Sequence, residues 1–200
     1  EEALKLSIQQ LTRDISTKTL ARANQDIYTL LKNGAKVDYR DKDGNQQSER
    51  VRFIDWDTPS NNHFLLVSQM WIKGPMHSKR PDLLGFINGI PLLFMELKAP
   101  DKKLKSAFND NLRDYKDTIT HLMWYNGIVL LSNGQQAKAG SLTAEWEHFA
   151  DWKKINDEGE VGIIDLDTLI RATCTKERLV DIVENFTVFQ EVPGGVIKLV

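Results

Sequence analysis

Three charged residues in segment 80–100, Asp82, Glu96 and Lys98, have the types and spacing for phosphate chemistry. Two carboxylates a few ångströms apart repel each other, and a hard cation such as Mg²⁺ relieves that repulsion by taking oxygen ligands. Such a cation polarises a phosphoryl oxygen and lowers the pKa of a bound water. The ammonium of Lys98 is suited to position that water or to stabilise charge developing on phosphorus. Brought together, the three residues suit hydrolysis of a phosphodiester.

A hairpin is the element that must position them. The Asn-Gly dipeptide at 88–89 separates two apolar runs and readily adopts the positive φ angles of a tight turn. The segment therefore predicts antiparallel strands over 83–87 and 92–97. Side chains two residues apart project from the same face of a strand, so Glu96 and Lys98 leave the sheet together.

The register of this hairpin decides whether Asp82 joins the pair. With a loop of only residues 88–89, Asp82 falls opposite Met95, on the wrong face. With a three-residue loop, Asp82 falls opposite Glu96, and a β-bulge has the same effect. We expect the register, or the bulge, that unites Asp82, Glu96 and Lys98, because a buried charged pair is costly unless it is paired or binds something.

The pattern resembles the signature of PD-(D/E)xK nucleases, a Pro-Asp pair followed after a hairpin by Glu-x-Lys. A longer run resembles the nuclease domain at the N-terminus of the restriction (R) subunit of type I restriction-modification enzymes. Asn62, Phe64 and Gln69 before the hairpin fit the same resemblance. The run itself consists of Arg-Pro-Asp at 80–82, Phe-Ile-Asn-Gly-Ile-Pro-Leu at 86–92 and Met-Glu-Leu-Lys-Ala-Pro at 95–100.

The resemblance implies an Mg²⁺-dependent endonuclease that cleaves double-stranded DNA as part of an ATP-dependent type I enzyme in the cytoplasm of a bacterium or archaeon. Asp82 and Glu96 would ligate the metal and Lys98 would activate water. The expected partners are DNA and the methyltransferase (M) and specificity (S) subunits. The chain contains no phosphate-binding Gly-x-x-x-x-Gly-Lys-Ser/Thr loop, so ATP would be used only by motor domains outside it.

Three further residues are candidates for contacting DNA or orienting the site. R subunits carry Gln-x-x-x-Tyr on the helix after the Glu-x-Lys strand, and here Asn111 stands where Gln is expected while Tyr115 matches. The alternative for Tyr115 is simple packing on the sheet. Arg80, just before Asp82, is suited to hold a phosphate, although charges at the start of a strand are often only solvated.

Two rival functions keep the same three charged residues. A repair or junction-resolving nuclease of the same fold would share them and act on branched DNA without ATP. A non-catalytic DNA-binding or assembly module would hold them as a buried ion-pair cluster.

Composition indicates an ordinary globular chain of 200 residues, 41% hydrophobic and 27% charged, with a net charge of −2. This charge gives no global signal for nucleic acid. The single cysteine, Cys174, excludes an internal disulfide, and no apolar run approaches the length of a membrane span. The chain starts without methionine and ends in an apolar run, so we expect it to be a piece of something longer.

The predicted fold is α/β, with a restriction-endonuclease-like mixed central β-sheet flanked by helices and a helical C-terminal appendage. We expect residues 1–160 to form the endonuclease domain, and 161–200 to form a helical extension and linker toward a motor domain outside this chain. The strand at 127–133 should run parallel to the Glu96 strand. The other expected elements are helices at 3–11, 16–31, 104–121, 165–173 and 176–184, an aromatic-rich helix around 145–152, strands at 37–41, 51–56, 64–72 and 135–141, and a linker at 193–195.

Overall fold

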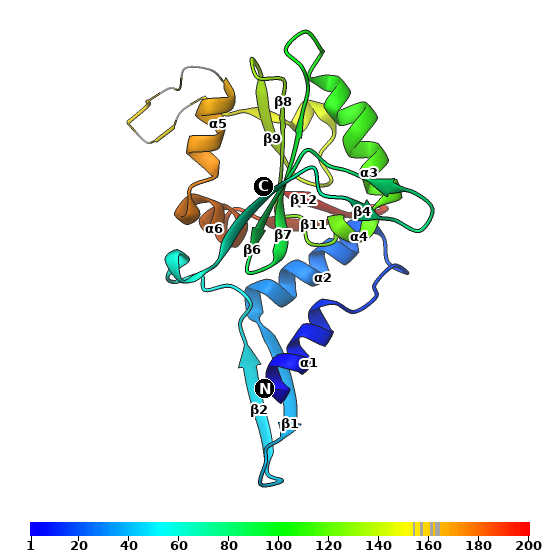
Figure 1. Ribbon diagram of the computed structural model, residues 1–200, viewed down its shortest axis with the longest axis vertical. Helices are drawn as coiled ribbons and strands as arrows, with labels where there is room; N and C mark the ends of the chain where they lie inside the picture. The colour runs from blue at the N-terminus through cyan, green and yellow to red at the C-terminus, as the bar shows by residue number, and fades with distance from the viewer. Residues whose placement is uncertain (154, 157, 161, 163–164) are drawn as a thin grey trace.

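The computed structural model of the chain describes residues 1–153, 155–156, 158–160, 162 and 165–200. In this part of the chain, six strands form a central sheet in the order β10-β9-β8-β7-β6-β3. The pair β7–β8 is parallel and the other pairs are antiparallel, so the sheet is mixed, as predicted (Figure 1). Its strands are β3 (Phe64–Ser68), β6 (Leu83–Ile87), β7 (Ile90–Leu97), β8 (Ile128–Ser132), β9 (Ala137–Gly140) and β10 (Ala150–Asp151).

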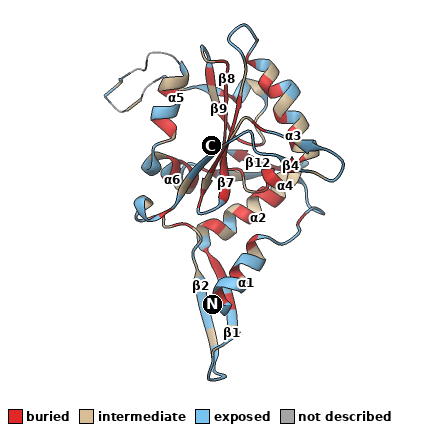
Figure 2. Ribbon diagram, viewed as in Figure 1, coloured by how far each residue is buried: buried red, intermediate tan, exposed pale blue. Residues whose placement is uncertain are grey.

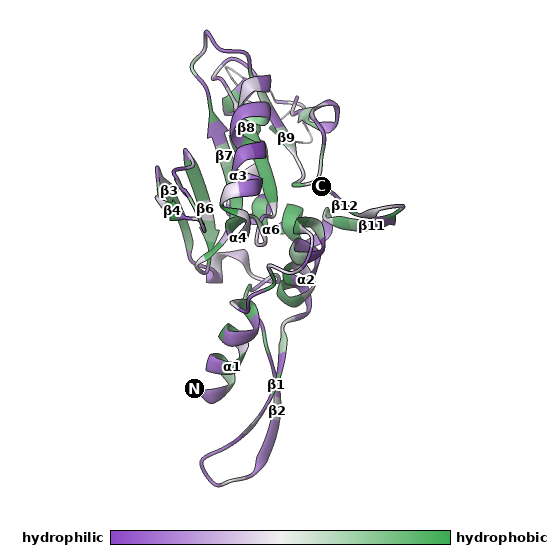
Figure 3. Cartoon of the chain, turned by 90° about the vertical axis from the view of Figure 1, so that its right-hand side faces the viewer, coloured by the Kyte–Doolittle hydropathy of each residue, from purple (hydrophilic) through white to green (hydrophobic). Residues whose placement is uncertain are grey.

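Helices cover both faces of this sheet. One face, here called the α3 face, packs against η2 (Ala107–Leu112), α3 (Arg113–Thr118) and α4 (Thr120–Met123), and Figure 3 shows α3 lying over β7 and β8. The opposite face packs against α2 (Leu20–Asn33), α5 (Asp165–Thr173) and α6 (Lys176–Asn185). Strands β7 and β8 are therefore buried on both sides, as their continuous apolar runs predict (Figure 2).

An N-terminal arm projects from this body. It is the hairpin of β1 (Ala35–Arg40) and β2 (Gln46–Val51), with α1 (Glu2–Leu11) packed along it (Figure 1). The expected strand at 51–56 is wrong, because β2 lies earlier in the chain. The Asp41 carboxylate accepts from the backbone N–H groups of Asp43 and Asn45 and so closes a tight turn, and β2 starts directly after this turn. Residues 52–62 instead form a loop ending in the short helix η1 (Pro59–Asn61), and α2 starts four residues later than expected.

The expected continuous helix over 104–121 is also interrupted. After two helical residues, 105 and 106, a π-helical turn runs over Ala107–Leu112 and continues as α3, which breaks at Ile119, where φ is −126° and ψ is 43°, before α4. The expected strand at 64–72 ends at Ser68, and a separate two-stranded ribbon of β4 (Ile72–Lys73) and β5 (Ser78–Lys79) follows.

Two predictions for the C-terminal part are wrong. The aromatic segment around 145–152 is a 3₁₀ turn, η3 (Trp146–His148), followed by β10, because the Phe149 ring packs where Gly140 has no side chain. Residues 193–195 are not a linker: Pro193 and Gly194 turn a hairpin between β11 (Val188–Val192) and β12 (Gly195–Leu199). This turn suits Pro at its first position and Gly at φ +96° at its second.

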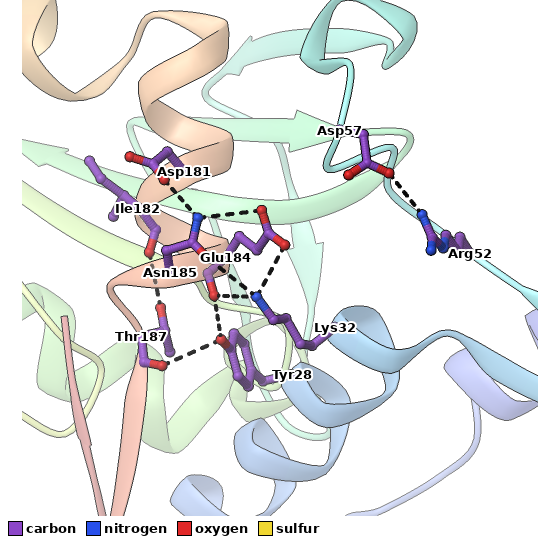
Figure 4. A network of polar contacts seen from close by, with 9 residues as sticks. All are labelled: Tyr28, Lys32, Arg52, Asp57, Asp181, Ile182, Glu184, Asn185 and Thr187. Carbon is purple, nitrogen blue, oxygen red and sulfur yellow. Dashed lines mark hydrogen bonds and ion pairs between the residues drawn. The ribbon is translucent and has the colours of Figure 1, made fainter.

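The C-terminal helix α6 is anchored on α2 by polar contacts as well as by the shared core. Lys32 pairs with Glu184 at 3.1 Å and also donates to the carbonyl of Glu184 at 2.8 Å, while the Tyr28 hydroxyl donates to the same carbonyl at 3.0 Å (Figure 4). Residue 161, where the C-terminal extension was predicted to begin, lies outside the described residues. None of the helices described combines the length and apolar character needed to cross a lipid bilayer.

Candidate active site

A β-bulge sets the register of the β6–β7 hairpin. The loop is only Asn88-Gly89, with Ile87 paired to Ile90, so the three-residue loop is not formed. Phe86 pairs with Pro91 and Gly85 with Leu93, which leaves Leu92 as an extra residue on β7. Leu83 then pairs with Met95, so Asp82 comes alongside Glu96. Of the two arrangements predicted to bring Asp82 beside Glu96, a three-residue loop or a β-bulge, the hairpin forms the bulge.

The pleat of the two strands directs the charged side chains to one face. Phe94 on β7 and Leu84 on β6 both belong to the core of the α3 face, whereas Met95 belongs to the opposite core. Since side chains alternate along a strand, Glu96 and Asp82 project on the side of Phe94 and Leu84. The chemistry-bearing groups therefore gather at the edge of the α3 face.

Both carboxylate oxygens of Asp82 accept hydrogen bonds from neutral donors. Gln69 donates from Nε2 to Oδ1 at 2.6 Å, and the backbone N–H of Leu97 donates to Oδ2 at 2.9 Å. The second bond ties the start of β6 to the end of β7. Neither donor carries a charge, so the negative charge of Asp82 stays available to a cation.

Glu96 is the buried acid of the site. Its side chain is 3% exposed, Oε1 lies 3.9 Å from the Lys98 amine, and Oε2 is buried without a hydrogen-bond partner among the described residues. Burial, and next the charge of Asp82, raise the pKa of Glu96 to about 8, while Lys98 opposes the rise. A buried polar atom with no partner is uncommon and calls for a ligand or a proton to satisfy it.

Lys98 is held from the neighbouring helix. Its amine donates to Asn111 Oδ1 at 2.5 Å, and its backbone N–H donates to the Ser132 carbonyl on β8 at 2.8 Å. The side chain remains 21% exposed, so solvent reaches the amine. Asn111 belongs to the π-helical turn η2, a distortion found frequently at functional sites.

Tyr115 lies one turn beyond Asn111 and is 7% exposed, with its ring edge-on to Phe94 at 5.7 Å between centroids. Burial raises the pKa of its hydroxyl, a hydrogen bond with the Asn111 side chain opposes this, and the charges of Glu96 and Asp82 add to it. Tyr115 therefore packs on the sheet, as one of the two alternatives for this residue predicts, and it lies close enough to the carboxylates for their charges to raise its pKa. A role for Tyr115 in orienting the site stays a prediction.

Arg80 does not join the group. Its guanidinium stacks over the Trp71 ring at 5.2 Å, and the structure places no hydrogen bond or ion pair between it and either carboxylate, all of which lie among the described residues. The neighbouring Lys79 pairs with Asp114 on α3 at 2.7 Å. Gln69, by contrast, donates to Asp82. The sequence placed Gln69 inside the expected strand at 64–72 and within the family resemblance, which was the signal for it, but assigned it no role.

The donor set fits a hard divalent cation. Mg²⁺ is commonly bound through one or two carboxylates, with water completing its coordination. Asp82 and Glu96 provide that pair, and Glu96 Oε2 has an unused lone pair. Across the described residues, no cluster of three or more His, Cys, Asp or Glu side chains is arranged to hold a metal, so any protein cage here has only two acids.

The sequence is similar to proteins of one kind. A family described as type I restriction enzyme R protein N terminus matches residues 2–148. The endonuclease subunit of the type I restriction enzyme HindI from Haemophilus influenzae is 35% identical over 175 residues, which are 84% of this chain and 16% of that protein. The putative MjaIXP endonuclease subunit from Methanocaldococcus jannaschii is 29% identical over 210 residues, covering 94% of this chain and 20% of that protein.

A shorter match, 30% identical over 88 residues and 44% of this chain, is to the SauCOLORF180P endonuclease subunit of Staphylococcus aureus, of which it covers 9%. The chain thus spans a fifth or less of the length of the relatives that it matches. The family match runs through the hairpin, the carboxylate pair and the helix that holds Lys98. The chain therefore belongs to the family of N-terminal domains of type I restriction enzyme R proteins.

Proposed function

We propose that this domain is a metal-dependent endonuclease that cleaves double-stranded DNA within a type I restriction enzyme. The observation that carries the proposal is the meeting of Asp82 with a buried Glu96 whose Oε2 has no partner, beside an amine held by Asn111. The names of the relatives, all endonuclease subunits, support the same reaction.

Each residue then has a defined task. Asp82 and Glu96 would hold Mg²⁺, which when bound supplies a Lewis acid for the phosphoryl oxygen and a more acidic water. Lys98 would hold the attacking water through its amine and stabilise negative charge on the phosphate. Asn111 would fix the direction of that amine, and Tyr115 would border the site. Arg80, seated on Trp71 just outside the carboxylates, would contact the DNA backbone.

The geometry favours this proposal over a non-catalytic module. In a structural ion pair, the amine and carboxylate would satisfy each other by hydrogen bonding. Here Lys98 donates to Asn111 and stays 3.9 Å from Glu96, while Glu96 keeps an unpartnered oxygen. An ionised Glu96 is costly to keep in this arrangement without a ligand. The family match disfavours a junction-resolving nuclease. Cleavage of branched DNA without ATP would support that alternative.

Calorimetry with Mn²⁺ on the 200-residue chain tests the proposal. We expect binding by the wild type and a much weaker Mn²⁺ affinity in Asp82→Ala and Glu96→Ala. Cleavage by the isolated chain is a poor test, because the whole enzyme would also use motor, M and S subunits. Binding that both alanine variants retain, or no binding by a folded wild type, would support an inert module. We place the enzyme in the cytoplasm, where its DNA substrate lies.

A further inference from the structure

Gln69 occupies a strained position directly beside the site. It follows the last residue of β3, and its backbone N–H donates to the Asp82 carbonyl at 2.9 Å, extending the β3–β6 pairing by one step. Its φ angle is +54°, in the left-handed region that residues other than Gly rarely adopt. Among the described residues, Asn88 in the hairpin turn is the other non-Gly position with a positive φ, at +50°.

The strained backbone conformation of Gln69 brings its side chain into contact with Asp82. Gln69 Nε2 donates to Asp82 Oδ1 at 2.6 Å, and the N–H of Leu97 takes Oδ2 at 2.9 Å. Two donors on opposite oxygens fix both the position and the rotation of the carboxylate plane. Gln69 is itself exposed, so this bond is not needed to satisfy a buried amide. Backbone strain kept for an exposed contact is typical of functional sites.

The chemical type of the side chain also matters. An ionised carboxylate has about four lone-pair positions, so two hydrogen bonds leave room for a cation. A Lys or Arg at position 69 would fix Asp82 equally well but would neutralise it and repel a metal ion. A neutral amide fixes the carboxylate without altering its charge.

From these contacts we infer that Gln69 is a positioning residue, which holds the Asp82 carboxylate in the orientation that binds the divalent cation. The inference rests on the proposed function, because it assigns Gln69 a task only if Asp82 is a metal ligand. Groups that orient metal ligands typically change metal affinity by about 10–100-fold when removed.

The test compares Gln69→Gly with Asn88→Gly in the full 200-residue chain. Glycine adopts positive φ freely, so both variants lose backbone strain together with one amide side chain. The Asn88 amide bonds the Phe53 carbonyl and Asn62, and its oxygen accepts from the N–H of His63, all in the loop at the other end of β6. Calorimetry measures Mn²⁺ affinity, and urea unfolding measures stability.

We expect Gln69→Gly to weaken Mn²⁺ binding by about 10–100-fold with no loss of stability, and Asn88→Gly to lower stability with Mn²⁺ affinity retained. An affinity for Gln69→Gly equal to that of the wild type would overturn the inference and leave the proposed function standing. A folded wild type that binds no Mn²⁺ would overturn both.

A double-mutant cycle separates positioning from a general structural effect. If Gln69 acts through Asp82, adding Gln69→Gly to Asp82→Ala should change the residual Mn²⁺ affinity by less than about threefold, because the group it orients is already gone. The same fold loss in both backgrounds would show that Gln69 acts on the metal site independently of Asp82, contrary to the inference.

Discussion

The backbone N–H of Leu97 donates to Asp82 Oδ2 at 2.9 Å, which locks the end of β7 to the start of β6 beside Glu96. This bond exists because Leu92 is an extra residue on β7. Without that bulge, the two-residue loop would place Asp82 opposite Met95, on the other face of the sheet. One extra residue in a strand therefore determines whether the two carboxylates share a site.

Substitution of the three charged residues should separate cutting from motor action in the whole enzyme. Asp82→Ala, Glu96→Ala and Lys98→Ala are each expected to abolish DNA cleavage while leaving ATP-driven translocation largely intact, because under the proposed function each removes a metal ligand or the amine that positions water. Cleavage of plasmid DNA and a translocation assay measure the two activities.

The matched control for Lys98 is Lys102→Ala. Lys102 is an exposed lysine in the same loop, and its amine pairs with Asp101 at 3.2 Å. It should retain cleavage close to that of the wild type. Normal cutting by any of the three site variants removes that residue from the mechanism.

Metal binding should release a proton from Glu96. A carboxyl with a pKa of about 8 is mostly protonated at pH 7 and must ionise to ligate a cation. We expect Mn²⁺ affinity to rise by about tenfold from pH 6 to 7, by about fivefold from pH 7 to 8, and then to level off. Calorimetry at pH 7 in two buffers of different ionisation enthalpy should count close to one released proton. Binding without proton release would contradict the raised pKa of Glu96.

Without metal, Glu96 should make stability fall as pH rises. Its folded pKa of about 8 lies above the ordinary value of 4.5, so the folded state retains a proton that the unfolded state loses between these values. Stability therefore decreases across this window and levels off above it. Glu96→Gln cannot ionise, so it should raise the free energy of unfolding at pH 8 by on the order of 1–3 kcal/mol, and by much less at pH 5.

Urea unfolding at the two pH values checks this difference. Lys198 titrates with the opposite sign, since burial lowers its pKa to about 7, but it is present in both proteins and cancels when they are compared. A Glu96→Gln variant less stable than the wild type at pH 8 would mean that the carboxylate is satisfied in the fold.

The sequence predicted the hairpin and the parallel strand well because their signals are local. The Asn-Gly turn and the apolar runs mark β6, β7 and β8 without reference to the rest of the chain. The bulge could only be offered as an alternative. Residues 92–95 are all apolar, so either register buries them, and alternation carries no information about which one forms.

Long-range contacts account for the errors. The segment around 145–152 has helical spacing of aromatics, but the Phe149 ring lies over Gly140, and that pairing is not visible locally. The apolar run at the C-terminus contains Lys198, whose buried amine donates to the carbonyls of Asn126 and Gly127 at 2.5 and 2.7 Å. The contact of Gln69 with Asp82 likewise joins two strands whose pairing had to be known first.

The last prediction concerns Asn111, which stands where the family resemblance implies a Gln. The shorter side chain still reaches the Lys98 amine, at 2.5 Å, from the π-helical turn. Asn111→Leu keeps the volume but removes the acceptor, so the amine loses its fixed direction. We expect the cleavage rate of the whole enzyme to fall by about 10–100-fold, because small displacements of a reacting group are costly. Mn²⁺ affinity should stay within about threefold of the wild type, since neither carboxylate is touched.

Tyr115→Phe is the matched comparison for Asn111→Leu. It removes only the hydroxyl next to Asn111 and keeps the ring edge-on to Phe94, so its effect on the cleavage rate should be smaller. Single-turnover cleavage and Mn²⁺ calorimetry on both variants decide the matter. If Asn111→Leu cuts at the wild-type rate, Lys98 does not depend on this contact. If Asn111→Leu loses Mn²⁺ binding instead, Asn111 supports the carboxylates rather than the Lys98 amine, and its proposed role is wrong.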